Sequence, residues 1–173
     1  MAAVSTSRRS LTGLLLIIAG ALLLLAIILP LAGLAVSWLG GLGYLVLAVA
    51  LIVFAIGGVN AMLTKVLLIV SGVGWALLAL GAFGLALPGV LVTIAALVAG
   101  IGTVVAAIVL YVGKEIRNTP ALFFIITAVL GLLVLLPSFG VAALAGTLYT
   151  IIAVAFAVGL IVTGYLFTRK EGR

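Results

Sequence analysis

The near absence of charge over most of the chain is the feature that most constrains its fold. The only charged residues between positions 66 and 168 are Lys114, Glu115 and Arg117. A helix needs about 20 consecutive apolar residues to cross the hydrocarbon core of a membrane, and uncharged runs such as 14–29 approach that length. The chain is 68% hydrophobic and 6% charged, whereas soluble domains are roughly 25% charged. We therefore expect a membrane protein and exclude a soluble globular fold.

Apolar segments divide the chain into six candidate membrane helices. They fall at residues 11–29, 31–58, 61–87, 89–112, 121–136 and 139–167. The sequence therefore predicts an all-α membrane protein with six transmembrane helices, in which residues 1–173 form a single integral membrane domain. Five helices are the alternative, which would require a glycine-rich join such as 39–43 to lie inside one helix.

With six helices, every basic residue falls on the same side of the membrane. The candidate headgroup-contacting and orientation residues are Arg8, Arg9, Lys65, Lys114, Arg117, Arg169, Lys170 and Arg173. Loops rich in Lys and Arg stay on the cytoplasmic side. The opposite joins, around 38–43, 81–89 and 137–141, carry no charge. We expect both termini to be cytoplasmic, a multi-pass protein of the inner or plasma membrane, and anionic lipid headgroups as partners.

The N-terminal segment has one competing interpretation. Residues 7–11 (SRRSL) precede an apolar run and are loosely similar to a twin-arginine export signal. The apolar run is longer than the core of a signal peptide, which holds about 7–15 residues. We therefore expect the first helix to stay in the mature protein.

The charged stretch at 113–119 lies between the fourth and fifth apolar segments. We expect a cytoplasmic loop in which Glu115 is solvated beside Lys114, and a catalytic loop is the less favoured alternative. Thr119 could cap the next helix and Pro120 suits its first turn, where a missing N–H is harmless. Asn60 could cap the third helix in the same way.

The chain contains what we interpret as an internal repeat. Leu-Pro pairs stand at the uncharged joins as Leu29-Pro30, Leu87-Pro88 and Leu136-Pro137, and each Pro could start the following helix. The segments from Leu14, Val66 and Leu122 also begin alike. We predict three tandem two-helix hairpins, at about 8–60, 61–117 and 118–173, related by an axis along the membrane normal. The alternative is that all Leu-rich segments resemble one another.

Small residues recur along the fourth and sixth helices at spacings of three and four. The candidate helix-packing positions are Gly89, Thr93, Ala96, Gly100, Thr103 and Ala107, followed by Gly146, Thr150, Ala153, Ala157 and Gly164. Membrane helices associate by close packing, which small residues permit. We expect these positions at helix contacts, with the Leu-rich faces of the first and fifth helices toward lipid. The sequence is compatible with a homo-oligomer and with a membrane protein partner.

The residue types present exclude most catalytic chemistry. The chain has no Cys and no His, and its only acidic residues are Glu115 and Glu171. We expect no catalytic, cofactor-binding or metal-binding residue, because acid–base catalysis and metal ligation need such groups. The basic residues are scattered, so nucleic acid is not an expected partner. Lys65 should extend along its helix to lipid phosphate, with a substrate-binding role as the alternative.

Polar side chains inside the predicted helices have two possible roles. They are Ser71, Trp75, Thr93, Thr103, Thr127, Thr147, Tyr149, Thr150 and Thr163. Most should bond their own backbone or a neighbouring helix, while those on the small-residue stripes could line a narrow axial path. The aromatic residues Trp38, Tyr44, Tyr111 and Tyr165 are expected as anchors at the membrane interfaces.

The segment RRSLTGLLLIIAGALLLLAIILP, residues 8–30, and its two echoes resemble the HdeD-like family of small acid-resistance membrane proteins. The resemblance implies a six-helix inner-membrane protein of acid or envelope stress without enzymatic activity. The bare outer loops depart from that family's pattern. A non-enzymatic stress protein is thus the first hypothesis, with a passive pore or carrier for small neutral solutes or lipids, or an accessory subunit of a larger membrane complex, as alternatives.

Overall fold

The computed structural model describes residues 6–34, 38–139 and 146–168. These residues form six α-helices and one short 3-10 helix, without a strand among them, which confirms the predicted all-helical fold. The elements are α1 (Thr6–Leu31), α2 (Trp38–Gly57), α3 (Met62–Ala82), α4 (Gly89–Val112), α5 (Asn118–Val134), η1 (Leu136–Phe139) and α6 (Gly146–Thr168).

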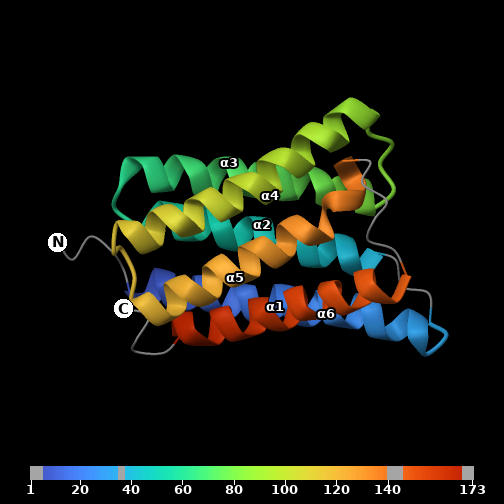
Figure 1. Cartoon of the computed structure of the whole chain (residues 1–173), viewed down its shortest axis with the longest axis horizontal. Coiled ribbons are helices and arrows are strands. Elements are labelled where there is room, and N and C mark those ends of the chain that lie inside the picture. The colour runs from blue at the N-terminus through green and yellow to red at the C-terminus, as the bar shows by residue number, and fades with distance from the viewer. Residues whose placement is uncertain (1–5, 35–37, 140–145, 169–173) are drawn as a thin grey trace.

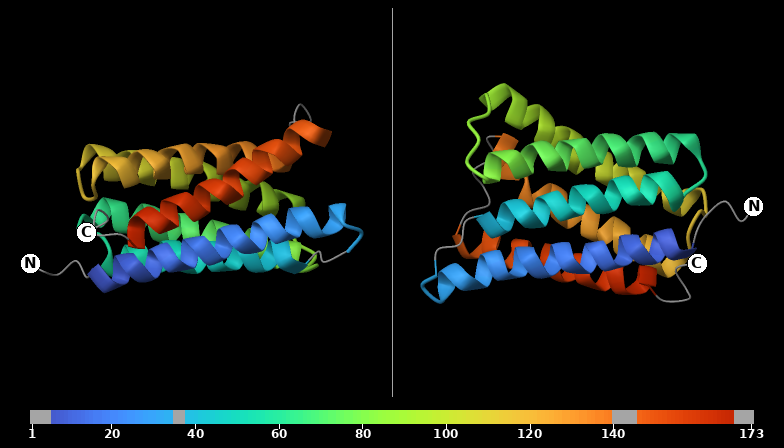
Figure 2. Two further views of the ribbon diagram at one scale, coloured as in Figure 1. Left: turned by 90° about the horizontal axis from the view of Figure 1, so that it is seen from below. Right: turned by 180° about the vertical axis from the view of Figure 1, so that it is seen from behind.

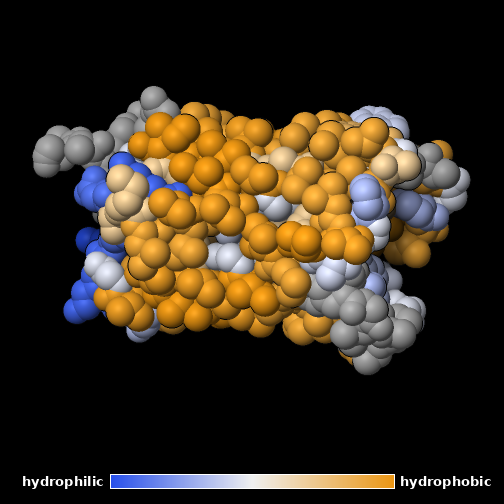
Figure 3. All heavy atoms as spheres, turned by 90° about the horizontal axis from the view of Figure 1, so that it is seen from above, coloured by the Kyte–Doolittle hydropathy of each residue, from blue (hydrophilic) through white to orange (hydrophobic). Residues whose placement is uncertain are grey.

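Five of the helices, all except α5, are long and apolar enough to cross a membrane. The helix α5 has 17 residues, or about 26 Å at 1.5 Å per residue. It runs alongside the other five (Figure 1). On the face shown in Figure 3, apolar side chains cover most of the surface between the two ends of the bundle. The length and composition of the five helices indicate a multi-pass membrane protein.

The six helices form a closed ring. Each helix packs against its neighbours in sequence, and α1 packs against α6 to complete the circle. Figures 1 and 2 show the ring as two layers, with α1, α2 and α3 in one and α4, α5 and α6 in the other. The core therefore lies inside the ring, where each helix turns one face inward.

The two ends of the ring differ in charge. The charged end carries the start of α1, the α2–α3 and α4–α5 connections and the end of α6 (Figure 1). Lys65, Lys114 and Arg117 lie there, and Arg8 and Arg9 are in the first turn of α1. The remaining predicted orientation residues, Arg169, Lys170 and Arg173, lie outside the described residues. The opposite, neutral end holds connections that carry no charged residue, and the hydrophilic surface is concentrated at the charged end (Figure 3).

Glycines allow α1 and α6 to approach closely where they close the ring. A Cβ atom on Gly13 would meet the carbonyl oxygen of Gly164, and a Cβ atom on Gly164 would meet that of Gly13. Two turns further along, a Cβ on Gly20 would lie 2.6 Å from the carbonyl oxygen of Ala157. Small residues at such positions let membrane helices pack at short range.

Glycines, and not prolines, end α1 and α3 at the neutral end. Gly33 (φ 89°) and Gly84 (φ 98°) adopt the left-handed conformation. The amides that follow them donate to Leu29 and Leu80, in the Schellman pattern that terminates α1 and α3. Pro30 lies inside the last turn of α1 and Pro137 inside η1, so the expectation that each Pro starts the next helix is wrong for these two.

Two other predicted boundaries also differ from the structure. Residues 38–43, expected as a join, form the first turns of α2, which begins at Trp38. The third proline, Pro88, is the N-cap of α4 and agrees with the expectation. At the charged end, Arg117 is the N-cap of α5, so Thr119 lies inside the helix and does not cap it. Pro120 lies in the first turn, as predicted.

The start of α3 is capped by a side chain from a distant part of the chain. Ala61, not Asn60, is the N-cap residue and offers no side-chain bond. The Glu115 carboxylate instead accepts hydrogen bonds from the amides of Asn60 (3.0 Å) and Ala61 (3.1 Å), and from the Thr64 hydroxyl (2.6 Å). An anion at a helix N-terminus satisfies free amides and complements the helix dipole. Glu115 is therefore a structural capping group.

A Schellman turn at the end of α4 positions Glu115 for this role. The Lys114 amide donates to Tyr111 and the Glu115 amide donates to Leu110, both at 3.2 Å. Lys114 takes the left-handed position (φ 56°) that glycine usually occupies. The turn thus links the α4–α5 connection to the start of α3.

Candidate functional site

A cavity of about 480 Å³ lies inside the ring toward its neutral end. It is bounded by α2 to α6, the α3–α4 connection and η1, through Tyr44, Leu78, Gly81, Leu85, Ala86, Leu87, Val92, Val134, Leu135, Pro137 and Tyr149. A second hollow of about 140 Å³ shares Tyr44, Val134 and Tyr149 with it and extends toward α1. Ligand sites in proteins are concavities of this size, mostly apolar with a few polar groups.

Tyr44 and Tyr149 supply the polar side chains of this cavity. Tyr44 projects inward from the first turns of α2, and Tyr149 does so from the first turn of α6. Both side chains are half-buried. Among the described residues, neither phenol hydroxyl has a hydrogen-bond partner. Groups of this kind are normally paired with protein, water or a ligand, and both residues line the cavity.

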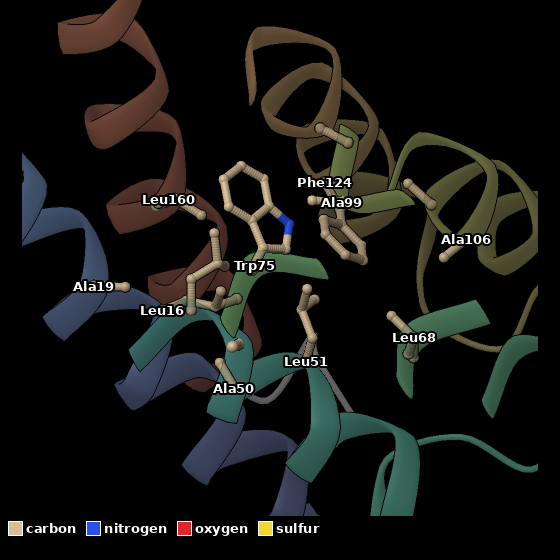
Figure 4. Close-up of a cluster of buried hydrophobic side chains, with 14 of the residues drawn as sticks. Leu16, Ala19, Ala50, Leu51, Leu68, Trp75, Ala99, Ala106, Phe124 and Leu160 are labelled. Atoms are coloured by element: carbon tan, nitrogen blue, oxygen red, sulfur yellow. The ribbon is translucent and has the colours of Figure 1, made fainter. Parts of the chain in front are cut away.

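A layer of aromatic rings, formed by Tyr44, Trp75 and Phe156, lies behind the cavity. The Trp75 ring centroid is 5.3 Å from that of Tyr44 and 5.9 Å from that of Phe156, which it stacks at 17°. The indole N–H donates to the Thr103 hydroxyl (3.0 Å), which donates to the Ala99 carbonyl (2.5 Å). Trp75 is 1% exposed, and Figure 4 shows it projecting from α3 into the space that the helices enclose. We call these rings the central aromatic layer.

A second layer fills the ring nearer the charged end. Phe54 of α2 and Phe124 of α5 both pack edge-on against Phe167 of α6, at centroid distances of 5.1 and 6.1 Å. All three side chains are buried. The hydroxyls of Thr127 and Thr163 share a buried hydrogen bond of 3.0 Å that joins α5 to α6. We call the three rings the phenylalanine layer.

The small-residue positions predicted on α4 and α6 have different environments along each helix. Ala96, Gly100, Thr103 and Ala107 of α4 are buried, as are Ala153, Ala157 and Gly164 of α6. The remaining four lie nearer the neutral end, where Gly89 and Gly146 are exposed and Thr93 and Thr150 are half-buried. Large side chains such as Leu14 and Ile18 of α1, and Leu122 and Ile126 of α5, are exposed on the outside of the ring.

Several hydroxyl groups bond to their own helix. Ser71, Thr93 and Thr150 each donate to the carbonyl four residues earlier. Two glycines on neighbouring helices make room for such side chains. A Cβ on Gly102 would lie 2.5 Å from the Ser71 hydroxyl oxygen, and one on Gly159 would lie 2.7 Å from the Thr127 hydroxyl oxygen. These groups serve helix structure and packing.

The charged side chains lie apart from the cavity. Lys65 is half-buried, and Lys114 and Arg117 are exposed. None of the three belongs to the cavity lining. Over the described ranges, no group of three or more His, Cys, Asp or Glu side chains could hold a metal ion. The cavity therefore offers hydrogen bonding and apolar contact as its means of recognition.

Tyr44 is the residue whose place the sequence interpretation missed. Trp38, Tyr111 and Tyr165 are exposed at helix ends, whereas Tyr44 faces the inside of the ring and is not an interface anchor. One signal was present, because Tyr44 lies three and four residues before the buried residues Leu47 and Ala48. That spacing places all three on one helix face.

Comparison of the chain with protein-family models, with curated proteins and with solved structures gave no match.

Proposed function

We propose that this protein binds a small neutral molecule in the cavity at the neutral end of the ring and acts as a carrier for it. The observation that carries the proposal is the pair of phenol hydroxyls, of Tyr44 and Tyr149, which have no hydrogen-bond partner among the described residues and line a cavity whose other side chains are apolar. The proposed function is non-enzymatic, because the cavity lining contains no acidic, basic or thiol side chain.

The lining defines the chemistry of the molecule. A charged ligand would lose its hydration without gaining an opposite charge, which is strongly unfavourable. A neutral molecule with an apolar body and one or two hydrogen-bond acceptors would fit the apolar walls and the two hydroxyls. The aromatic ring of Phe156, which borders the smaller hollow, favours a planar or ring-containing ligand.

The filling of the ring interior supports a carrier over an open pore. The central aromatic layer and the phenylalanine layer occupy the interior between the cavity and the charged end. A carrier needs a binding site open to one side at a time, and here the site lies on the neutral side of both layers. Transport would then require Trp75 to leave its contacts with Phe156 and Thr103.

A variant with a single tryptophan tests binding directly. Trp38 and Trp75 are the only tryptophans, so Trp38→Phe leaves Trp75 as the sole indole fluorophore behind the cavity. We expect its emission to change saturably with a neutral ring-containing probe such as benzyl alcohol or menadione. Glycerol, which has no apolar body, should change it little. Stopped-flow uptake of the same probes into proteoliposomes tests transport.

The double substitution Tyr44→Phe with Tyr149→Phe removes both hydroxyls and keeps both rings. A neutral hydrogen bond contributes about 0.5–1.5 kcal/mol, so the double variant should weaken probe binding by about fivefold to a hundredfold. Tyr111→Phe, at an exposed tyrosine, is the matched control. Probe binding that is equal in all three proteins would contradict the proposed site, as would the absence of any saturable signal.

We further propose that the charged end faces the cytoplasm and that α5, like the other five helices, spans the membrane. The location of Lys65, Lys114 and Arg117 at that end supports this orientation. On this orientation the cavity opens outward, and the membrane is the inner or plasma membrane.

We also propose that the ring is built from three hairpin repeats. The cyclic helix order is compatible with this arrangement. The sequence element that supports it is a Gly followed by an aliphatic residue, at Gly33-Leu34 and Gly84-Leu85, where the structure has Schellman turns. The third unit differs at this point, because α5 ends at Val134 and η1 follows it.

The resemblance of residues 8–30 to the HdeD-like family suggests a physiological role for the protein. A role in acid or envelope stress is compatible with a carrier and rests on that sequence segment alone. It predicts that deletion of the protein lowers survival at low pH, and that the protein with both tyrosines replaced restores survival less well than the Tyr111→Phe control.

A further inference from the structure

A groove lies on the outside of the ring, between α3 and α4. Its volume is about 280 Å³, and every residue that lines it is apolar: Ile69, Val70, Val73, Gly74 and Leu77 of α3 with Ile94, Ala95 and Val98 of α4. These helices belong to the five that are long and apolar enough to cross a membrane. The groove therefore opens toward lipid hydrocarbon. We call it the α3–α4 groove.

The shape of the α3–α4 groove follows from small residues at its floor and branched residues at its walls. A Cβ on Gly74 would lie 2.8 Å from the Ala99 amide nitrogen and 2.9 Å from the Ala95 carbonyl oxygen, so the two backbones nearly touch there. Val73 and Ile94 rise on either side and are half exposed, at 50% and 51%. Branched side chains therefore border a floor formed by Gly74 and Ala95. The groove suits a single extended hydrocarbon chain better than a helix, which is about 10 Å wide.

A cationic side chain stands at the charged end of this groove. Lys65 precedes Ile69, Val73 and Leu77 on the same row of α3, at successive intervals of four residues. Residues four apart form one ridge along a helix. The α3 residues of the groove lie about 11 to 22 Å from the start of α3 at Met62, so an extended acyl chain from the charged end would pass the centre of the bilayer, about 15 Å deep, to fill the groove. An acyl chain lying in the groove would place its phosphate at the level of Lys65.

We infer that the α3–α4 groove binds one acyl chain of an anionic phospholipid from the leaflet at the charged end, with Lys65 holding the phosphate. The inference does not depend on the cavity inside the ring. Lys65 is half-buried, so its methylene groups lie against the helix while its ammonium group reaches the headgroup. Lys114 and Arg117 add positive charge at the same end, which favours an anionic lipid over a zwitterionic one.

Native mass spectrometry tests this inference on the full chain. The protein is reconstituted in vesicles of phosphatidylglycerol and phosphatidylcholine in equal amounts, extracted in mild detergent, and its retained lipids are identified. We expect one retained phospholipid per chain, with phosphatidylglycerol preferred. A lysine near the surface contributes about 1 kcal/mol, so Lys65→Gln should lower this preference about fivefold, while Lys65→Arg should keep it.

Filling the groove tests the position of the chain. Val73→Trp places a large ring in the groove and should abolish lipid retention. Val49→Trp, at an exposed position of α2, is the matched control and should retain the lipid. Melting of each variant in detergent verifies folding, and if Val73→Trp does not fold, the Lys65→Gln and Lys65→Arg pair decides.

Four outcomes would overturn the inference. The wild type could retain no phospholipid, or retain both headgroups equally. Lipid retention could be the same in Val73→Trp and Val49→Trp. Finally, the protein could be recovered as a lipid-free dimer that Val73→Trp dissociates, which would place a second copy of the chain on the groove.

Discussion

The cap that Glu115 provides to α3 leads to a quantitative prediction. Its carboxylate accepts hydrogen bonds from two backbone amides, of Asn60 and Ala61, at exposed positions, and from the hydroxyl of the buried residue Thr64. Loss of a helix N-cap costs about 0.5–2 kcal/mol. Water can replace the carboxylate at the exposed amides, whereas the Thr64 hydroxyl is 0% exposed and loses a short charge-assisted bond. We therefore expect Glu115→Ala to cost about 2 kcal/mol, toward the upper end of that range.

Thermal unfolding in mild detergent measures this cost. For a chain of this size, 1 kcal/mol corresponds to about 2–4 °C in Tm, so Glu115→Ala should lower Tm by about 4–8 °C. Glu115→Gln keeps one acceptor oxygen and loses the charge, so its Tm should lie between those of Glu115→Ala and the wild type. Hydrogen exchange gives a local readout, because the amides of Asn60 and Ala61 should lose protection in Glu115→Ala. Glu171→Ala, which removes the only other carboxylate side chain, is the control.

A double-mutant cycle with Thr64→Val separates capping from a general effect of charge. The coupling between Glu115 and Thr64 should be about 1 kcal/mol, as for residues in direct hydrogen-bond contact. The reasoning is refuted if Glu115→Ala melts within about 1 °C of the Glu171→Ala control and the Asn60 and Ala61 amides stay protected.

Three further predictions concern the ring. Lys114→Gly should raise the free energy of unfolding by about 0.5–1 kcal/mol in denaturation experiments, because glycine relieves the left-handed backbone at this turn (φ 56°); equal or lower stability would contradict this. Gly13→Ala should cost about 1–3 kcal/mol by crowding the facing carbonyl of α6, whereas Gly40→Ala, with open space around it, should not destabilise. A single cysteine at Asn118 should react with a membrane-impermeant maleimide from the cytoplasmic side and one at Ala82 from the opposite side, and labelling of both from one side would refute the alternation of the helices.

The helical fold could be predicted from the sequence because it depends on composition over whole segments. In a membrane, the N–H and C=O groups of the backbone must be hydrogen-bonded within each segment. A long uncharged run such as 14–29 is therefore expected to form a helix, which pairs these groups internally. The ends of the helices were less predictable. Pro30 can remain in the last turn of α1 because Gly33, three residues later, supplies the conformation that ends it.

The site could not be predicted because it depends on how each helix is rotated and which helices meet. A tyrosine at the membrane interface and a tyrosine that faces the inside of the ring are the same residue in the sequence. Tyr44 was recognised as inward-facing only through its contact with Trp75. The bond between Glu115 and Ala61 joins residues 54 positions apart, and nothing in the local sequence of 113–119 identifies that partner. The pattern of residues along the sequence does not show which distant segments are in contact.

Because synthesis runs from the N-terminus, α1 is made before α6, against which it packs. While α6 is still in the ribosome, Gly13 and Gly20 of α1 have no partner helix, and the rings of Phe54 and Trp75 lack the neighbours Phe167 and Phe156 that α6 supplies. A nascent chain of five helices is thus an open arc, and we expect membrane quality control to degrade chains truncated before 146. Since the start of α1 and the end of α6 lie at the same end of the ring, a short linker could join them, and a circularly permuted chain cut at the α2–α3 connection should assemble the same ring.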